Sequence, residues 1–310
     1  MSLLLTLGFP GSIWTFFIGI ILGLGITILT LGFISMIIFI ILIYSGVIRI
    51  TPVLDFFHKC VQTFFPSLET STKDTIQKTF IINETNTGAR AKEGIYCFHP
   101  HGSFSVSYFF HTMTHLTDFP VRGRATVAQA LYWLPWGKEI LENMNAVPNT
   151  YGEMKKVLEG HESLFVIPGG VLEMNMEHKR KEIKIFVKKR RGIFRLAIET
   201  GKPLIPVLSY GEEQLYELVS FPGFSVLKGF LEKFGIALPI PSLKTIITWL
   251  SATKGGIKNP IRTFIGEPIL YDSNSESIEE KINNLRNKYI EALKILFEKT
   301  KYPGYVLEIL

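Results

Sequence analysis

Hydrophobic residues are distributed unevenly along the chain, and its first part is the most apolar. The first 48 residues include no Asp, Glu, Lys, Arg or His, and the apolar run over residues 13–48 is far longer than the roughly 18 residues that predict a membrane span. As one straight helix this run would measure about 54 Å at about 1.5 Å per residue, against a hydrocarbon core of about 30 Å. The pattern therefore predicts a hairpin of two membrane helices, at 12–30 and 33–47, with a single long tilted helix as the alternative.

After this run, short apolar segments alternate with amphipathic helical patterns. Such alternation is typical of an α/β domain with a largely parallel central sheet. Ser277 and Glu280 form a capping box at the start of one predicted helix. The sequence predicts a membrane anchor at 1–50, a linker at 51–93 and the α/β domain at 94–310. The predicted strands are 95–98, 164–167, 204–210 and 262–265, and the predicted helices are 151–158, 193–200 and 277–299.

The formal net charge of +6 lies entirely after residue 48. Arg49, His58 and Lys59 directly follow the apolar run and favour a cytosolic exit of the chain from the membrane. Two cysteines are present, Cys60 and Cys97, and in the cytosol both would be reduced thiols. Because Cys97 lies inside a predicted strand, we expect it to be a buried core residue.

The segment His99-Pro100-His101-Gly102 is the densest chemical signal in the chain. It directly follows the predicted strand 95–98 and precedes an apolar helix predicted to begin near Ser103. Ligands and catalytic groups collect at the carboxyl ends of strands in parallel sheets. An imidazole titrates near neutral pH, so a histidine here can act as a general base that takes the proton of a hydroxyl group. The alternative is a structural turn whose histidines bond backbone groups.

Two further segments suggest ligand contacts. Pro168-Gly169-Gly170 follows a predicted strand, and its glycines leave backbone amides accessible to an oxyanion or a phosphate; a tight turn is the alternative. Basic residues cluster between His178 and Arg195, with Glu182 as the only acid. Such a cluster requires an anionic partner or open solvent, and the start of the predicted helix 193–200 adds a favourable partial charge.

Several short segments share their order and spacing with a known family. They are HPHG at 99–102, PGGVLE within 165–173, and the segments 190–197, 201–206 and 209–212. Together, over roughly residues 90–270, they resemble the type-2 diacylglycerol acyltransferase family, which includes monoacylglycerol and wax-alcohol acyltransferases. The chain departs from the family at its YFP motif, since Phe64-Phe65-Pro66 is too far upstream of His99 to be equivalent.

The resemblance implies a glycerolipid-acyltransferase-like domain with an N-terminal membrane hairpin. It implies that His101, in preference to His99, is the base in acyl transfer. Glu173 is expected to fix the tautomer of His101 and to stabilise its imidazolium; the alternative is that Glu173 caps or pairs with one of the nearby basic residues. Related glycerolipid acyltransferases use an Asp five positions after the His, whereas Val106 and Phe104 stand at those positions here.

The resemblance also implies the substrates and the location. Acyl-CoA is expected as co-substrate, with no permanently bound cofactor and no metal. The acceptor is expected to be a neutral lipid, diacylglycerol first, with monoacylglycerol or a wax alcohol as alternatives. The expected location is the endoplasmic reticulum membrane, with the domain facing the cytosol, and lipid droplets as a second site. The residues expected to contact acyl-CoA are Gly169, Gly170, Arg190, Arg191 and Arg195, of which Arg191 and Arg195 are preferred.

Two other classes of function compete with this interpretation. A His-x-His pair at a strand end can bind a metal in hydrolases, but such sites need further ligands after later strands, and His178 is the last histidine. A non-catalytic lipid-surface protein with the same fold is the second alternative. Anionic lipid headgroups could use the basic cluster, whereas nucleic acid is not expected as a partner of a membrane-anchored chain.

Overall fold

The computed structural model describes most of the predicted α/β domain. The predicted membrane hairpin and most of the predicted linker lie outside the described residues. Within the described part, no helix combines the length and the apolarity needed to cross a bilayer. The described residues are 77–84, 93–114, 117–133, 137–174, 176, 181–215, 217, 242, 260–271 and 277–310.

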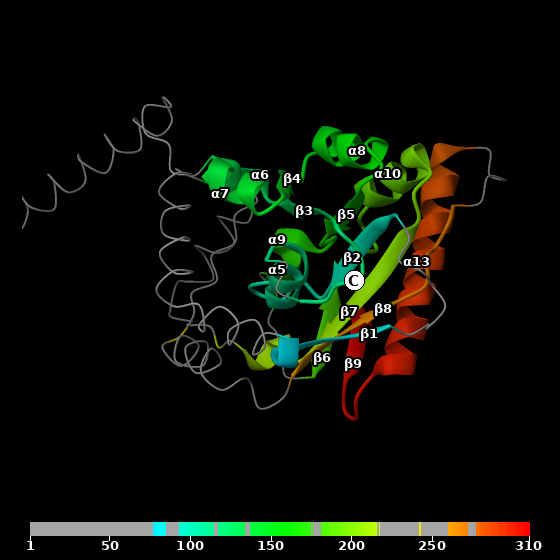
Figure 1. Ribbon diagram of the computed structural model, residues 1–310. Helices are drawn as coiled ribbons and strands as arrows, with labels where there is room; N and C mark the ends of the chain where they lie inside the picture. The colour runs from blue at the N-terminus through cyan, green and yellow to red at the C-terminus, as the bar shows by residue number, and fades with distance from the viewer. Residues whose placement is uncertain are drawn as a thin grey trace, which may run out of the picture. The chain divides into compact units, whose positions relative to one another are not determined.

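A seven-stranded sheet forms the centre of the domain (Figure 1). Its strands are β1 (Phe80–Glu84), β2 (Ile95–His99), β3 (Gly123–Val127), β4 (Ala146–Pro148), β5 (Ser163–Val166), β7 (Leu204–Tyr210) and β8 (Ile261–Ile265). They are ordered β1-β8-β7-β2-β5-β3-β4, and every neighbouring pair is parallel except β7 with β8. The prediction of an α/β fold with a mostly parallel central sheet is confirmed.

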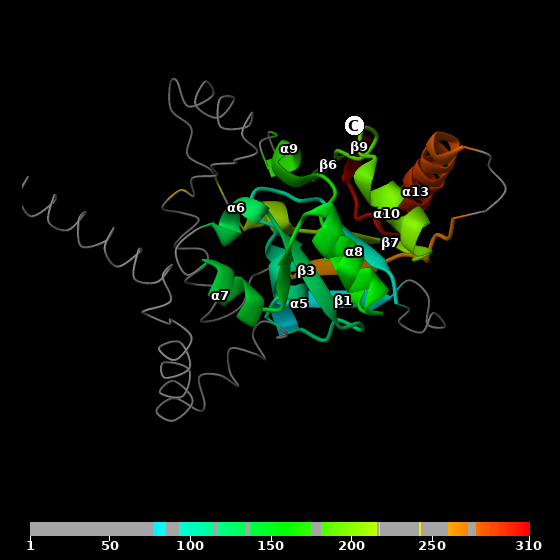
Figure 2. The same cartoon turned by 90° about the horizontal axis from the view of Figure 1, so that it is seen from above.

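The side chains of β2 alternate between the two faces of this sheet, as the strand period of two requires. Ile95 and Cys97 belong to a core formed with three helices, whereas Tyr96 and Phe98 belong to a second core on the other face. The helices of the first core are α8 (Tyr151–Glu159), α10 (Gly192–Thr200) and α13 (Ile278–Thr300), seen together from above in Figure 2. The second core is covered by α5 (Val106–Thr112).

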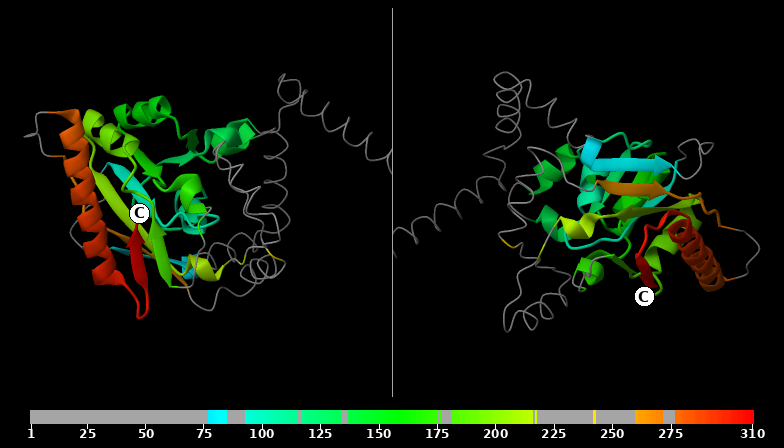
Figure 3. Two further views of the ribbon diagram at one scale, coloured as in Figure 1. Left: turned by 180° about the vertical axis from the view of Figure 1, so that it is seen from behind. Right: turned by 90° about the horizontal axis from the view of Figure 1, so that it is seen from below.

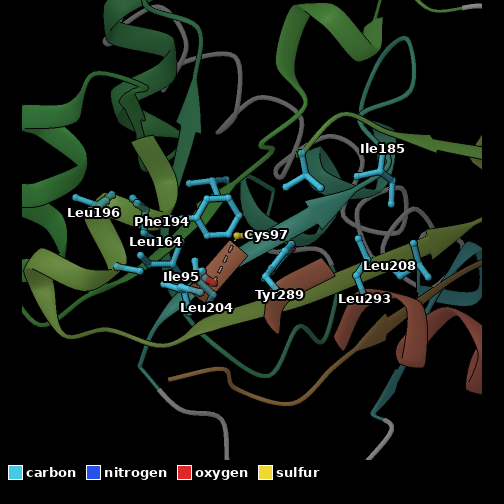
Figure 4. Packing of buried hydrophobic residues seen from close by; sticks show 14 of the residues in the cluster. Ile95, Cys97, Leu164, Ile185, Phe194, Leu196, Leu204, Leu208, Tyr289 and Leu293 are labelled. Atoms are coloured by element: carbon cyan, nitrogen blue, oxygen red, sulfur yellow. Dashed lines mark hydrogen bonds between the residues drawn. The ribbon is translucent and has the colours of Figure 1, made fainter. Parts of the chain in front are cut away.

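Cys97 lies deep in the first core, near Phe194 and Tyr289 (Figure 4). Its side chain is 1% exposed, and burial raises the pKa of its thiol to about 12. The thiol is therefore protonated at neutral pH and serves as a core residue, as the sequence predicted.

The long helix α13 is held to the domain by one apolar face. Ser277 caps it by accepting a hydrogen bond from the Glu280 backbone amide, and the reciprocal bond completes the predicted capping box. The buried residues of this face are Ile282, Leu285, Tyr289, Leu293, Leu296 and Phe297. At about 1.5–3 kcal/mol for each large apolar side chain removed from water, this face anchors the helix firmly.

Short elements complete the described domain. The short helices are α6 (Gln129–Tyr132), α7 (Gly137–Asn143) and α9 (Gly170–Met174), and the 3₁₀ helix η1 (Glu212–Gln214) follows β7. A separate parallel pair joins β6 (Glu182–Ile185) to β9 (Val306–Ile309), the red strand in Figure 3.

The predicted elements differ from the structure in several places. Residues 80–84 fall inside the predicted linker, yet they form β1 at the edge of the sheet beside β8 (Figure 3, right view). The strands β3 and β4 were not predicted, because Gly123 and Arg124 weaken the apolar pattern of the first and the second has three residues. The helix expected near Ser103 begins at Val106.

Candidate functional site

His99 is the last residue of β2 and faces the helical core rather than a cavity. Side chains alternate along a strand, so His99 points to the same face of the sheet as Ile95 and Cys97, the face covered by α13. There its Nε2 is 2.7 Å from the Tyr289 hydroxyl oxygen. The residue is 1% exposed, and burial lowers the pKa of its ring to about 3. His99 is therefore neutral and inaccessible to solvent, and its role in the turn is structural.

His101 lies two residues beyond the strand end and lines a cavity. Its Nδ1 is 2.9 Å from the carbonyl oxygen of Gly102 and 2.7 Å from Oγ of Ser105. A carbonyl oxygen can only accept, so in neutral His101 the proton is assigned to Nδ1 and the lone pair to Nε2. This is the tautomer in which Nε2 can act as a base.

Glu173 holds the backbone of this turn. Its two carboxylate oxygens accept hydrogen bonds from the backbone amides of His101 and Phe186, each at 2.6 Å. The sequence predicted that this carboxylate would orient the imidazole, whereas the described ring contacts of His101 are with Gly102 and Ser105. Glu173 therefore fixes where the residue sits, by binding its amide.

The surroundings of Glu173 are unusual for a carboxylate. The side chain is fully buried, and this burial raises its pKa to about 7, although the two amide hydrogen bonds and Arg190 act in the opposite direction. A Cβ atom at position 169 would overlap the carboxylate, so Gly169 is required by this close approach. Gly169 thus has a packing role beside the buried acid, whereas Gly170 has a positive φ of 55° and lines the cavity.

The cavity that contains His101 has a volume of about 740 Å³. It follows the carboxyl ends of β2, β5, β3 and β4, which are neighbours in the sheet, over about 14 Å at roughly 4.8 Å per strand. Its polar groups include His101, Ser105 and Arg190 at the β2 end. Most of the lining is apolar, and it includes Phe104, Tyr108, Phe109, Met113, Leu131, Leu141, Met144, Met154, Ile167, Val171 and Ile193.

The three arginines proposed for acyl-CoA lie in different environments. Arg190 is half-buried, lines the cavity, and donates a hydrogen bond to the Gly169 carbonyl oxygen. Its buried Nε has no hydrogen-bond partner among the described residues. Arg191 and Arg195 are exposed and form ion pairs with Glu279 and Glu199. Of the three, Arg190 is the one that lines the same cavity as His101.

Three residues of the site had no role in the sequence interpretation. Ser105 bonds the imidazole, Tyr289 bonds His99 from α13, and Glu212 binds the start of α5. Only Glu212 was signalled in advance, because it stands in one of the segments that resemble the family. The partners of Ser105 and Tyr289 depend on the turn and on helix packing, which the sequence pattern does not specify. Within the described ranges, no group of three or more His, Cys, Asp and Glu side chains is placed to hold a metal ion.

Comparisons with known proteins identify the family of this chain. Residues 77–307 match the family described as diacylglycerol acyltransferase. The 2-acylglycerol O-acyltransferase 1 of Bos taurus is 31% identical over 220 residues, which cover 67% of this chain and 65% of that protein. Diacylglycerol O-acyltransferase 2B of Umbelopsis ramanniana is 26% identical over 222 residues, covering 67% of this chain and 63% of that protein. The chain thus spans just under two thirds of the length of these relatives.

A solved structure is also similar. The crystal structure of the 1-acyl-sn-glycerophosphate (LPA) acyltransferase PlsC from Thermotoga maritima aligns with a TM-score of 0.45 and 13% identity, over 86% of this chain and 96% of that chain. The family match is the stronger finding, because it covers residues 77–307, which include the whole of the site described above. By this match and by its identity to the bovine relative, the chain belongs to the type-2 diacylglycerol acyltransferase family.

Proposed function

We propose that the chain is a membrane-bound acyltransferase that moves a fatty acyl group from acyl-CoA to the hydroxyl of a neutral lipid. One observation carries this proposal: His101, which follows the carboxyl end of β2, lines a long apolar cavity. A volume of about 740 Å³ is within the range of roughly 300–1,000 Å³ typical of small-molecule sites, and its apolar walls suit an acyl chain.

The chemistry requires one base and no covalent intermediate. Nε2 of His101 takes the proton of the acceptor hydroxyl as that oxygen attacks the thioester carbonyl carbon. The carbon–sulfur bond then breaks, and the new ester bond remains on the lipid. The imidazolium returns its proton to the leaving thiolate, which releases free CoA and restores the base.

The mouth of the cavity supports delivery of a lipid substrate. Phe109 and Leu131 line the cavity and are also exposed, at 37% and 41%. Apolar residues at an open rim favour entry of a substrate from a lipid phase over entry from water. Together with the apolar run at 13–48, they support an anchored enzyme, and we propose a hairpin anchor in the endoplasmic reticulum membrane with the domain on the cytosolic side.

Diacylglycerol is the acceptor that we propose first, to give triacylglycerol. A 2-acylglycerol is the second candidate, because the bovine relative with 31% identity is named for that acceptor. The test is full-length protein in detergent with labelled oleoyl-CoA and a panel of diacylglycerol, 2-acylglycerol and a long-chain alcohol. Transfer to diacylglycerol supports the proposal, transfer only to another acceptor replaces the first choice, and no transfer to any acceptor favours a non-catalytic lipid-surface protein.

The position of Arg190 leads to a prediction about acyl-CoA. Arg190→Ala should raise the KM for acyl-CoA about tenfold or more, because a hydrogen bond to a charged group contributes about 1.5–3 kcal/mol. The matched variant Arg191→Ala removes an exposed arginine paired with Glu279 and should leave that KM within about twofold. Steady-state kinetics at saturating acceptor measures both. A larger effect from Arg191→Ala, or from Arg195→Ala, would return the preference to the exposed pair.

A further inference from the structure

Ser105 lies between His101 and α5, and its hydroxyl contacts the imidazole. Its Oγ is 2.7 Å from Nδ1 and 3.3 Å from Nε2 of His101, and it donates to the His101 carbonyl oxygen at 3.0 Å. The residue is 8% exposed, so solvent does not easily replace it as a partner of the ring. Its hydrogen bond to His101 is therefore made on the ring itself.

The directions of these hydrogen bonds are consistent with one arrangement. The Gly102 carbonyl oxygen requires the proton on Nδ1, so the Ser105 oxygen accepts from the same nitrogen. The Ser105 hydroxyl hydrogen is then used toward the His101 carbonyl oxygen. Each hydrogen has an acceptor, and the lone pair of the imidazole remains on Nε2.

The backbone of Ser105 is held in a conformation that L-residues rarely adopt. Its φ and ψ are 49° and 47°, in the left-handed region. This conformation costs a residue with a Cβ atom roughly 1–2 kcal/mol of conformational energy. The next two amides, of Val106 and Ser107, both donate at 3.0 Å to the Glu212 carboxylate, and the Ser107 hydroxyl bonds it as well. These are amides that the first turn of a helix leaves without partners.

Glu212 is therefore an anchor for the start of α5. It is 2% exposed and comes from η1, after β7, so it joins the middle of the sheet to the residue that follows Ser105. With Glu173 on the amide of His101, two buried carboxylates hold the two ends of the segment 101–107. Between them, the Ser105 hydroxyl and the Gly102 carbonyl oxygen both contact Nδ1 of the ring.

We propose that Ser105 is a positioning residue for the acyl transfer: together with the Gly102 carbonyl oxygen it holds the ring of His101 through Nδ1, so that Nε2 faces the acceptor hydroxyl, and Glu212 fixes Ser105 through the start of α5. This inference rests on the proposed function. A serine beside an imidazole is also the arrangement of a nucleophile and its base, in which Ser105 would become an acyl ester. The proton that Gly102 requires on Nδ1 favours positioning, since a base at Nδ1 would have to be unprotonated.

The decisive variant is Ser105→Gly in the full-length protein. Glycine adopts positive φ without strain, so this change removes the hydroxyl and its bonds without straining the backbone, and the amide of residue 105 keeps its own bond to the His101 carbonyl oxygen. We expect kcat to fall about 10- to 100-fold, with the KM values within about twofold and an unchanged or higher thermal midpoint. His161→Gly is the matched control, because His161 also has a positive φ, of 60°, but lies on the exposed surface; its kcat should stay within about twofold.

A second variant separates positioning from folding. Ser105→Asp keeps an acceptor for Nδ1, and Asp tolerates the left-handed region better than most residues. A carboxylate stabilises the imidazolium and so raises the pKa of His101. The Ser105→Asp enzyme should therefore have a much higher kcat than Ser105→Gly, and the acid limb of its kcat–pH profile should lie at higher pH than in the wild type.

The outcomes that overturn the inference are distinct. A Ser105→Gly enzyme that keeps kcat within about twofold of wild type excludes the positioning role. Mass spectrometry of the wild-type enzyme stopped with oleoyl-CoA would replace it by the nucleophile role if an acyl ester is found on Ser105. Absence of transfer by the wild type itself, with every acceptor of the panel, would instead refute the proposed function on which the inference rests.

Discussion

Replacing His101 by alanine should lower kcat for acyl transfer by about 10²- to 10⁴-fold, the range contributed by a positioned general base. The residue lines the cavity, and its Nε2 carries the lone pair in the tautomer that Gly102 requires. Without it, the acceptor hydroxyl must attack while it keeps its proton, so the step slows but the binding of acyl-CoA is retained. The measurement is kcat with labelled oleoyl-CoA, with the KM for the donor from the same data.

The control for His101→Ala is His161→Ala. His161 has a side chain that is 82% exposed and should be neutral to activity. The thermal midpoint should be the same for both variants, because His101 is only partly buried. Added imidazole should restore part of the turnover of His101→Ala, since the site opens into a cavity large enough to admit it. Near-normal turnover of His101→Ala without imidazole would exclude this residue as the base.

The strands in the middle of the sheet could be predicted because they are buried on both faces. Residues 204–210 were predicted with the observed bounds of β7, which is buried at every position. β6, in contrast, lies in the basic cluster, and its alternating Glu182, Ile183, Lys184 and Ile185 was interpreted as a charged segment. Its pairing with β9 joins segments more than a hundred residues apart, and local pattern does not reveal such partners.

For the candidate site too, the order of residues along the chain predicts some features, whereas others depend on how side chains pack. The position of His101 after a strand followed from the sequence, and the alternation along β2 accounts for why His99 faces Tyr289 instead. The target of Glu173 did not follow, because a carboxylate near a histidine can bind the ring or the backbone. The structure distinguishes the two, since both oxygens receive backbone amides.

Each histidine of the motif therefore depends on one group that is distant in sequence, and His101 depends on a near neighbour as well. His99 is fixed by a hydroxyl from α13, and His101 is fixed through its amide by Glu173 and through its ring by Ser105. The arrangement keeps one imidazole neutral and buried while the other faces the cavity. The two histidines of this four-residue motif thus have different roles because of contacts from α13, from α9 and from the residue that precedes α5.

Replacing Glu173 by glutamine should reduce both stability and turnover. A glutamine side chain has one carbonyl oxygen, so the amide of either His101 or Phe186 must face an NH₂ group and lose its acceptor. A buried unsatisfied donor costs about 1–3 kcal/mol, and the turn that carries His101 is no longer fixed. We expect a lower thermal midpoint together with a kcat about 10- to 100-fold below wild type.

The pH dependence of stability separates this carboxylate from ordinary surface acids. Burial raises the pKa of Glu173 in the folded state to about 7, from 4.5, so between these values the folded protein binds more protons than the unfolded one. The wild-type free energy of unfolding therefore contains a contribution that is complete below about pH 4.5 and is lost as the pH rises through about 7, of about 3 kcal/mol in order of magnitude. Glutamine does not titrate, so the stability difference between wild type and Glu173→Gln should shrink as the pH is raised from 5 to 8.

The same measurement on Glu279→Gln provides the comparison. Glu279 has a side chain that is 56% exposed and pairs with Arg191 at the surface, so its removal should not produce a difference that shrinks over this window. Subtracting the free energy of unfolding of each variant from that of the wild type cancels the contributions of the buried histidines, because the wild type and both variants retain them. A difference for Glu173→Gln that is constant from pH 5 to pH 8 would mean that the carboxyl ionises in the folded protein at its ordinary pKa. The two backbone amides would then stabilise the ionised form enough to offset its burial, and the turn would hold its position equally well at every pH in this range.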